Sequence, residues 1–214
     1  KRYPDEDLLA QAPGDLIEWL KRERLTARDQ MDSAGDRGTA VHDGLEQYGK
    51  DGTVPDPERA HPADRGYVTA ARNFVVEVEP KIVGSEVVVG SAEYRFAGTF
   101  DAEMEVDPDR VVQVTETSDN YAGPKAVNLA GPFVLADYKT SKRAYPDHHL
   151  QLAIYEVARL EMGKRPTDDR LIVHLKPNGK YGLHRGKATP DQAVAAVQWF
   201  HRFTELEESL KGAS

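Results

Sequence analysis

The chain has 214 residues, of which 39% are hydrophobic, and a formal net charge of −8. This length suits one well-buried domain, and no apolar run approaches the roughly 18 residues of a membrane span. The chain contains no cysteine, which excludes disulfides and cysteine-ligated zinc or iron–sulfur sites and favours the cytoplasm.

The first third of the chain has the periodicity of helices. Helices are expected over residues 7–25, from a cap at Ser33 or Asp36 to Gly49, and over residues 63–76. A proline-rich loop over residues 51–62 separates the last two. We assign residues 1–80 to an N-terminal helical region.

Strand patterns dominate the middle of the chain. Strands are expected over residues 81–89, 93–106, 110–117 and 132–139, with a turn-rich excursion over residues 118–131. The next expected elements are a helix over 149–162, a hairpin over 171–185 and a closing helix over 190–210 with Ala193, Val194, Val197, Phe200 and Phe203 on one face. This order predicts an α/β fold in one domain, with a mixed-sheet core over residues 81–187 and a C-terminal helix over 188–214.

The stretch FVLADYKTSKR, residues 133–143, ends an apolar strand with a carboxylate and an ammonium. Asp137 and Lys139 are two apart, so they lie on one face of the strand. An ammonium beside a carboxylate can hold an attacking water and stabilise charge that builds on a phosphate. An ordinary surface ion pair, worth well under ~1 kcal/mol, is the alternative.

A second carboxylate, Asp101, lies in the stretch YRFAGTFDAEM, opposite an apolar face of Phe96, Phe100 and Met104. If the two strands pair antiparallel, Asp101 and Asp137 come close together. Two such carboxylates repel unless a cation lies between them, and Mg²⁺ suits oxygen ligands. Two surface aspartates at strand ends are the alternative.

Charge is unevenly distributed along the chain. Residues 125–187 hold 12 Lys and Arg against 6 Asp and Glu, although the whole chain is acidic. Such a segment can present a basic face to nucleic acid, although a solvated surface gives the same count. Lys142 and Arg143, just beyond the strand, are the candidates for phosphate contacts outside the site.

Four short motifs follow one another in a recognisable order. They are GTAVH (38–42), GTFD (98–101), DYK (137–139) and QLAIY (151–155). Together they resemble the PD-(D/E)XK nuclease superfamily, and the histidine and Q-x-x-x-Y motifs resemble its RecB-like branch. The resemblance implies a restriction-endonuclease-like mixed β-sheet flanked by helices.

The resemblance also implies roles for single residues. Ligands of Mg²⁺ or Mn²⁺ would be His42, Asp101, Asp137 and the Tyr138 carbonyl. Lys139 would position the nucleophilic water, while Gln151 and Tyr155 would support the site or contact DNA. Glu86, where such enzymes often carry an earlier acidic residue, is the weakest candidate.

The function that the resemblance implies is that of a stand-alone DNA exonuclease for recombination, repair or DNA processing in a bacterial or phage-infected cell. The chain departs from many relatives because it has no cysteine for an iron–sulfur cluster and no Walker motif for unwinding. Its expected partners are DNA, a recombinase, helicase or single-strand annealing protein, and further copies of itself. A structure-specific or restriction-like endonuclease and a DNA-binding module without hydrolysis are the alternatives.

Overall fold

The computed structural model describes residues 27–107, 109, 114–117 and 124–211, so the helix expected over 7–25 lies outside the described residues. The chain divides into two compact units, residues 1–39 and residues 40–214. The division into residues 1–80, 81–187 and 188–214 that the sequence suggests therefore stays a prediction. The sheet and the helices packed on it, described below, belong to the unit of residues 40–214. None of the described helices combines the length and the apolar character needed to cross a membrane.

Helices precede the sheet, as expected, but their boundaries differ. They are α3 (Ala27–Asp51), the 3-10 turn η1 (Pro57–Arg59) and α4 (Arg65–Val78). The predicted cap at Ser33 or Asp36 is wrong, because α3 runs through both positions without interruption. The helix ends beyond Gly49, at Asp51, and the next residue, Gly52, has a left-handed φ of 78° and donates its N–H to the Tyr48 carbonyl.

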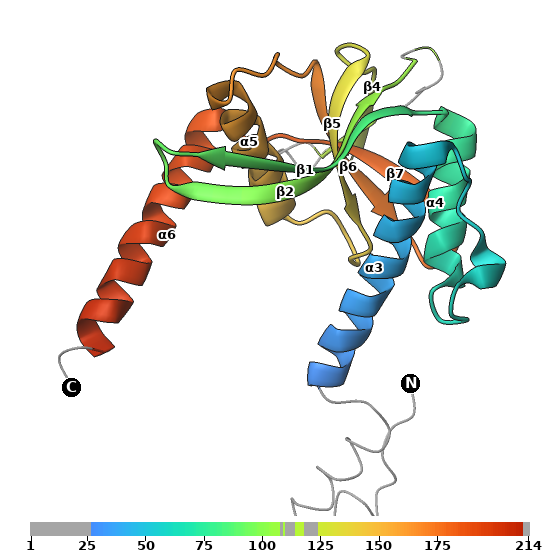
Figure 1. The fold of residues 1–214 in the computed structure, drawn as a ribbon, viewed down its shortest axis with the longest axis horizontal. Helices are drawn as coiled ribbons and strands as arrows, with labels where there is room; N and C mark the ends of the chain where they lie inside the picture. Colours follow the sequence, from blue (N-terminus) through green and yellow to red (C-terminus); the bar gives the residue numbers. More distant parts are fainter. Residues whose placement is uncertain (1–26, 108, 110–113, 118–123, 212–214) are drawn as a thin grey trace, which may run out of the picture. The chain divides into compact units, whose positions relative to one another are not determined.

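A seven-stranded mixed sheet forms the centre of the unit (Figure 1). Its strands are β1 (Lys81–Ser91), β2 (Phe96–Glu105), β3 (Val114–Thr117), β4 (Pro124–Val127), β5 (Phe133–Lys139), β6 (Asp169–Leu175) and β7 (Tyr181–Arg185). Their order is β1-β2-β5-β6-β7-β3-β4, with parallel pairing between β5 and β6 and between β3 and β7. The predicted mixed α/β sheet flanked by helices is confirmed.

One strand was not expected. The segment predicted to be a turn-rich excursion contains β4, which pairs antiparallel with β3 at the edge of the sheet. Pro124 stands at the first position of this edge strand, where a missing N–H breaks no internal ladder. The proline and glycines of residues 118–131 predicted a loop, but part of this segment pairs with β3 and is therefore a strand.

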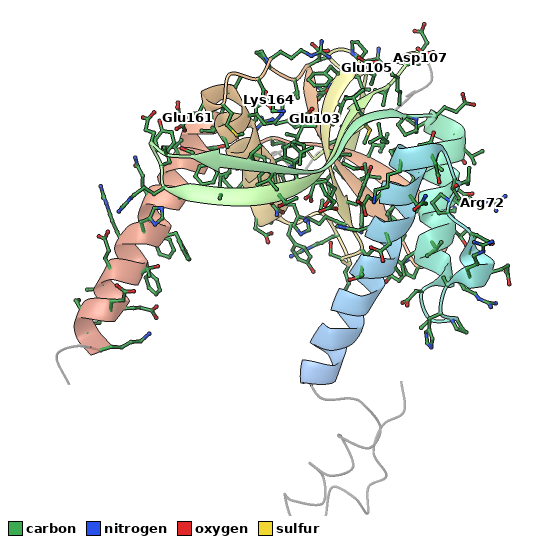
Figure 2. All side chains as sticks on the ribbon, viewed as in Figure 1. Arg72, Glu103, Glu105, Asp107, Glu161 and Lys164 are labelled. Atoms are coloured by element: carbon green, nitrogen blue, oxygen red, sulfur yellow. The ribbon has the colours of Figure 1, made fainter. Side chains whose placement is uncertain are left out.

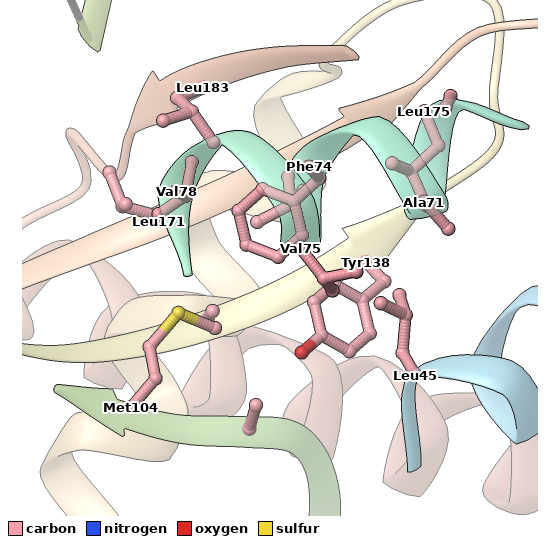
Figure 3. Packing of buried hydrophobic residues seen from close by; sticks show 14 of the residues in the cluster. Leu45, Ala71, Phe74, Val75, Val78, Met104, Tyr138, Leu171, Leu175 and Leu183 are labelled. Carbon is pink, nitrogen blue, oxygen red and sulfur yellow. The ribbon is translucent and has the colours of Figure 1, made fainter. Parts of the chain in front are cut away.

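Helices cover both faces of the sheet (Figure 1). On one face, α3 and α4 pack on the central strands, and Figure 3 shows Phe74 of α4 beside Tyr138 of β5 in this cluster. On the other face lies α5 (Pro146–Glu161), whose Leu152 and Tyr155 pack against Phe100 and Leu135. The α5 helix also forms the crossover that the parallel β5–β6 pair requires.

Strand β2 does not alternate regularly. Phe100 belongs to the cluster under α5, whereas Ala102 and Met104 belong to the cluster under α3 and α4. The expected shared face of Phe100 and Met104 is therefore wrong. Opposite the irregular step, β1 leaves extended geometry at Glu86, whose φ is 49°, between the paired positions Ser85↔Ala102 and Val87↔Phe100.

The outer ends of the sheet and helices are tied by polar contacts. Glu161 at the end of α5, labelled in Figure 2, accepts hydrogen bonds from the N–H groups of Ala92 and Glu93 in the β1–β2 turn.

The last helix, α6 (Pro190–Lys211), packs on α5 and buries Ala193 and Val197. Phe200 and Phe203, predicted on the same apolar face, are exposed instead.

Candidate functional site

The end of β5 carries the pair that the sequence places on one face. Lys139 Nζ lies 2.6 Å from Asp137 Oδ2, and the Asp137 residue is only 2% exposed. The ion pair lies outside hydrogen-bond geometry, so this buried oxygen has no hydrogen-bond donor among the described residues. A buried carboxylate oxygen without a donor is costly unless a cation compensates it.

Asp101 of β2 lies across from this pair. Strands β2 and β5 are antiparallel, and their paired positions run from Glu105↔Phe133 to Ala102↔Ala136, so Asp101 and Asp137 each lie one residue beyond the last pair. The expected pairing of the two strands is confirmed. The Tyr138 N–H donates a hydrogen bond to Asp101 Oδ2, which fixes the buried carboxylate at the β2–β5 junction.

His42 reaches the same point from α3. Its Nε2 lies 3.2 Å from the Tyr138 carbonyl oxygen, and its Nδ1 lies 3.3 Å from Asp101 Oδ1. The carbonyl can only accept, so Nε2 carries the proton of this hydrogen bond. In the neutral imidazole, Nδ1 then carries the lone pair, which a cation between it and the Asp101 carboxylate could accept, while the Nε2–H is held by a backbone carbonyl as in a metal-ligating histidine.

Glu86 completes the cluster from β1. Its Oε1 lies 4.0 Å from His42 Nδ1, and its side chain is exposed. His42, Glu86 and Asp101 each offer one ligand atom, and these three atoms all lie within 4.8 Å of one another. The cluster is therefore closed at Asp101 and open to solvent at Glu86, which was the weakest candidate in the sequence analysis.

The electrostatics of the cluster disfavour a second negative charge. Burial raises the pKa of Asp101 to about 7, and the Asp137 carboxylate adds to the increase. His42, the Tyr138 N–H and Lys139 each lower the pKa of Asp101, but the net pKa stays above its usual value. A divalent cation would reverse this balance, because it favours the charged form of each carboxylate that it contacts.

Gln151 and Tyr155 lie on one face of α5, where Gln151 Nε2 donates a 2.8 Å hydrogen bond to the Tyr155 hydroxyl. A Cβ at Gly98 would lie 2.9 Å from Tyr155 Cε1, so the glycine makes room for this ring against β2. Tyr155 is buried, and burial raises its pKa. The two residues therefore form a bonded pair between α5 and β2, and their support of the site stays a prediction.

Comparison with known proteins identifies the family. A family model described as the PD-(D/E)XK nuclease superfamily matches residues 18–213. The chain belongs to the PD-(D/E)XK nuclease superfamily. A search among curated proteins found no match.

Membership in the PD-(D/E)XK superfamily makes the chain a metal-dependent nuclease, a hydrolase whose substrate is DNA. The residues fit a divalent ion, since the imidazole of His42 and two carboxylates converge, and the neighbouring Asp137 Oδ2 has no hydrogen-bond donor in the described part of the chain. These are the ligand types of hard or borderline cations. No cysteine is present, so a cysteine-ligated iron–sulfur cluster is excluded.

The structure places the remaining predicted site residues as follows. The Tyr138 carbonyl, predicted as a ligand, accepts the His42 hydrogen bond. Lys142 and Arg143 are exposed in the loop after β5, where Arg143 lies over the Tyr145 ring at 4.9 Å, outside the carboxylate cluster. The ligand and DNA-contact roles stay predictions. The sequence motifs missed the Tyr138 N–H, because a backbone donor leaves no residue signature.

Proposed function

We propose that this PD-(D/E)XK nuclease is a Mg²⁺- or Mn²⁺-dependent DNA exonuclease of the RecB-like, stand-alone type. The observation that carries the proposal is the meeting of four segments at the β2–β5 junction. Glu86, Asp101 and His42 supply three ligand atoms within 4.8 Å of one another, two carboxylate oxygens and one imidazole nitrogen. Asp137 and Lys139 lie on the neighbouring strand.

The ion would be held by His42, Glu86 and Asp101, with Asp137 beside them. When bound, a divalent cation withdraws charge from a phosphate oxygen and makes a nearby water more acidic. Each ligand is oriented by the Tyr138 backbone or by its strand, so little reorganisation accompanies binding. The exposed Glu86 marks the side from which a phosphodiester can enter.

Lys139 supplies positive charge to the reacting phosphate. Its ammonium has three N–H donors, and the ion pair with Asp137 Oδ2 sets its position without a hydrogen bond. These donors can hold the attacking water and the phosphate oxygen on which charge grows in the transition state. Asp137 thus acts both on the cation site and as the group that positions Lys139.

The exonuclease assignment rests on the four motifs in their order and on the helix that carries Gln151 and Tyr155. The same motifs support a role in DNA recombination or repair in a bacterial or phage-infected cell, with a recombinase, helicase or single-strand annealing protein as partner. Lys142 and Arg143 are proposed to contact the DNA backbone beyond the scissile phosphate.

The proposal is tested with end-labelled linear DNA and covalently closed circular DNA, each incubated with and without Mn²⁺. We expect metal-dependent loss of the linear DNA from its ends, while the closed circle stays intact because it offers no end. Nicking of the circle would show that the protein is an endonuclease with the same core, and not an exonuclease. Binding without cleavage of either DNA, with Mg²⁺ and with Mn²⁺, would contradict a catalytic function.

A further inference from the structure

The C-terminal half of α6 carries a row of large apolar side chains on its exposed surface. Trp199, Phe203 and Leu206 are 64%, 45% and 56% exposed, and the rings of Trp199 and Phe203 stack at 5.3 Å. In Figures 1 and 2 this half of the helix, in red, extends beyond the sheet and α5. Water contact with three such side chains is unfavourable, which marks the row as an interaction surface.

The spacing of the row is that of a coiled-coil seam. Ala196, Trp199, Phe203, Leu206 and Leu210 follow one another at intervals of three, four, three and four residues. This is the a/d pattern of a heptad repeat, with Phe203 at a and Leu206 at d. We call these five residues the α6 seam.

The exposed aromatic and leucine side chains of the α6 seam point away from the rest of the domain. The buried residues of α6 are Ala193 and Val197, and His201 Nε2 bonds the Tyr94 carbonyl at 3.0 Å. At 100° per residue these positions lie on roughly the opposite side of the helix from Phe203 and Leu206. A second helix can therefore pack on Phe203 and Leu206 without displacing the contacts of Ala193, Val197 and His201.

We propose that the α6 seam binds the same seam of a second copy of the chain, as a parallel two-stranded coiled coil. With Phe203 at a, Arg202 occupies a g position and Glu207 occupies the e position five residues later. In a parallel pair, a g residue faces the e residue of the next heptad in the partner helix. Each Arg202 then faces Glu207 of the other copy, twice in the symmetric dimer.

The charge pattern selects this arrangement over the alternatives. In an antiparallel pair, e positions face e positions and g positions face g positions, so Arg202 and Glu207 would not meet. A helix of an unrelated protein could cover the apolar row, but the reciprocal Arg–Glu complementarity is a property of the chain with itself. The two nuclease domains would then lie on opposite sides of the paired helices.

The first experiment measures the oligomeric state of the full chain by sedimentation equilibrium. We expect a dimer that Leu206→Glu dissociates, with a dissociation constant at least about a hundredfold higher, because the substitution places two charges inside the seam. Val88→Glu, which changes an exposed valine of β1, is the matched control and keeps the dimer. A wild-type chain that stays monomeric over the micromolar range, or a Leu206→Glu variant that dimerises like wild type, would overturn the proposal.

The second experiment tests the parallel register by exchange of charges. Arg202→Glu and Glu207→Arg each create two like-charge pairs in their own dimers, whereas a mixture of the two variants restores both attractions. We expect each variant alone to dimerise about tenfold more weakly and the mixture to form mainly heterodimers. A mixture with no preference for heterodimers would contradict the parallel register.

Because the chain has no cysteine, a single Leu206→Cys substitution offers a check of the contact. In the parallel pair the two introduced thiols face each other across the seam and should form a disulfide-linked dimer under mild oxidation. Val88→Cys is the control that should stay monomeric on a non-reducing gel. Equal cross-linking of both variants, or none at Leu206→Cys, would contradict the proposed seam.

Discussion

The backbone N–H of Tyr138 donates a hydrogen bond to the Asp101 carboxylate, and this contact joins β2 and β5 at the centre of the site. The carbonyl of the same residue accepts from His42 Nε2. One peptide segment of β5 thus orients two side chains from other elements. Its neighbours Asp137 and Lys139 complete the arrangement, so the geometry of the site depends on the backbone of a single strand.

Replacement of Lys139 by methionine should remove catalysis but not the fold. The substitution deletes the ammonium beside Asp137 while keeping the length of the side chain, so we expect kcat to fall roughly 10²–10³-fold. The measurement is metal-dependent cleavage of labelled linear DNA together with the thermal melting curve. Lys81→Met, at the exposed Lys81–Glu105 ion pair, is the control, and equal activity of the two variants would contradict the role of Lys139.

Glu86→Gln should weaken metal binding, because it removes one negative charge from the three-residue cluster and keeps the shape of the side chain. We expect the affinity of the metal-free protein for Mn²⁺, measured by calorimetry, to fall about tenfold. Glu93→Gln changes an exposed acid on the same hairpin and should leave the affinity unaltered. A Glu86→Gln variant with wild-type affinity would remove Glu86 from the ligand set.

Gly98→Ala tests the support that α5 gives to the site. The added methyl would lie 2.9 Å from Tyr155 Cε1, so the ring and its hydrogen bond to Gln151 must shift. We expect kcat/KM on linear DNA to fall about tenfold, in the range that misplacement of positioning groups produces. Gly90→Ala, whose added methyl is 3.5 Å from the nearest atom, should behave like wild type. Equal kcat/KM values in both variants would show that the position of the Tyr155 ring does not affect catalysis.

Gly66→Ala should destabilise the fold. Its Cβ would lie 1.9 Å from the Pro177 carbonyl oxygen, a backbone atom of the β6–β7 turn that cannot move aside cheaply. We expect a loss of about 2–3 kcal/mol in the free energy of unfolding, measured with urea. Gly44 lies in α3, and a methyl added there would be 3.5 Å from the Pro55 side chain, which is an ordinary contact. Gly44→Ala should therefore raise the free energy of unfolding by about 0.5–1 kcal/mol through its higher helix propensity. If both variants gain stability, the close contact at Gly66 is not real.

Acid should destabilise the protein through His184. Burial lowers its pKa to about 4, with smaller contributions from His174 of β6, from Lys176 just after β6 and from His149 of α5. The folded pKa is below the unfolded value of 6.5, so this stability is complete above pH 6.5 and is lost as the pH falls toward 4.

The variant His184→Phe should therefore lose less stability than wild type between pH 7 and pH 5, by roughly 1–2 kcal/mol. Urea unfolding at the two pH values measures the difference. His61→Gln changes an exposed histidine and serves as the control. A pH dependence in His184→Phe as steep as in wild type would show that another group is responsible.

Local patterns predicted the elements that carry the motifs. Strand β5 and helix α5 were expected almost as they occur, because the apolar run of β5 and the periodicity of α5 are both set by neighbours in the chain. The antiparallel pairing of β2 with β5 was expected as well, and it brings the ends of the strands that carry Asp101 and Asp137 together. The start of α3 did not follow, since the helix runs through Ser33 without interruption. The existence of β4 did not follow either, because pairing with β3 overrode the local signal at Pro124.

The amino-acid sequence alone determined the residue types of the site, the strand that delivers Asp137 and Lys139, and the resemblance to PD-(D/E)XK nucleases. Only the tertiary structure decided that Glu86 joins His42 and Asp101, because β1 turns to a positive φ at that residue and alternation no longer predicts its direction. It also decided which side of α6 is exposed, since helical periodicity shows that a helix has an apolar face but not whether its own domain covers that face.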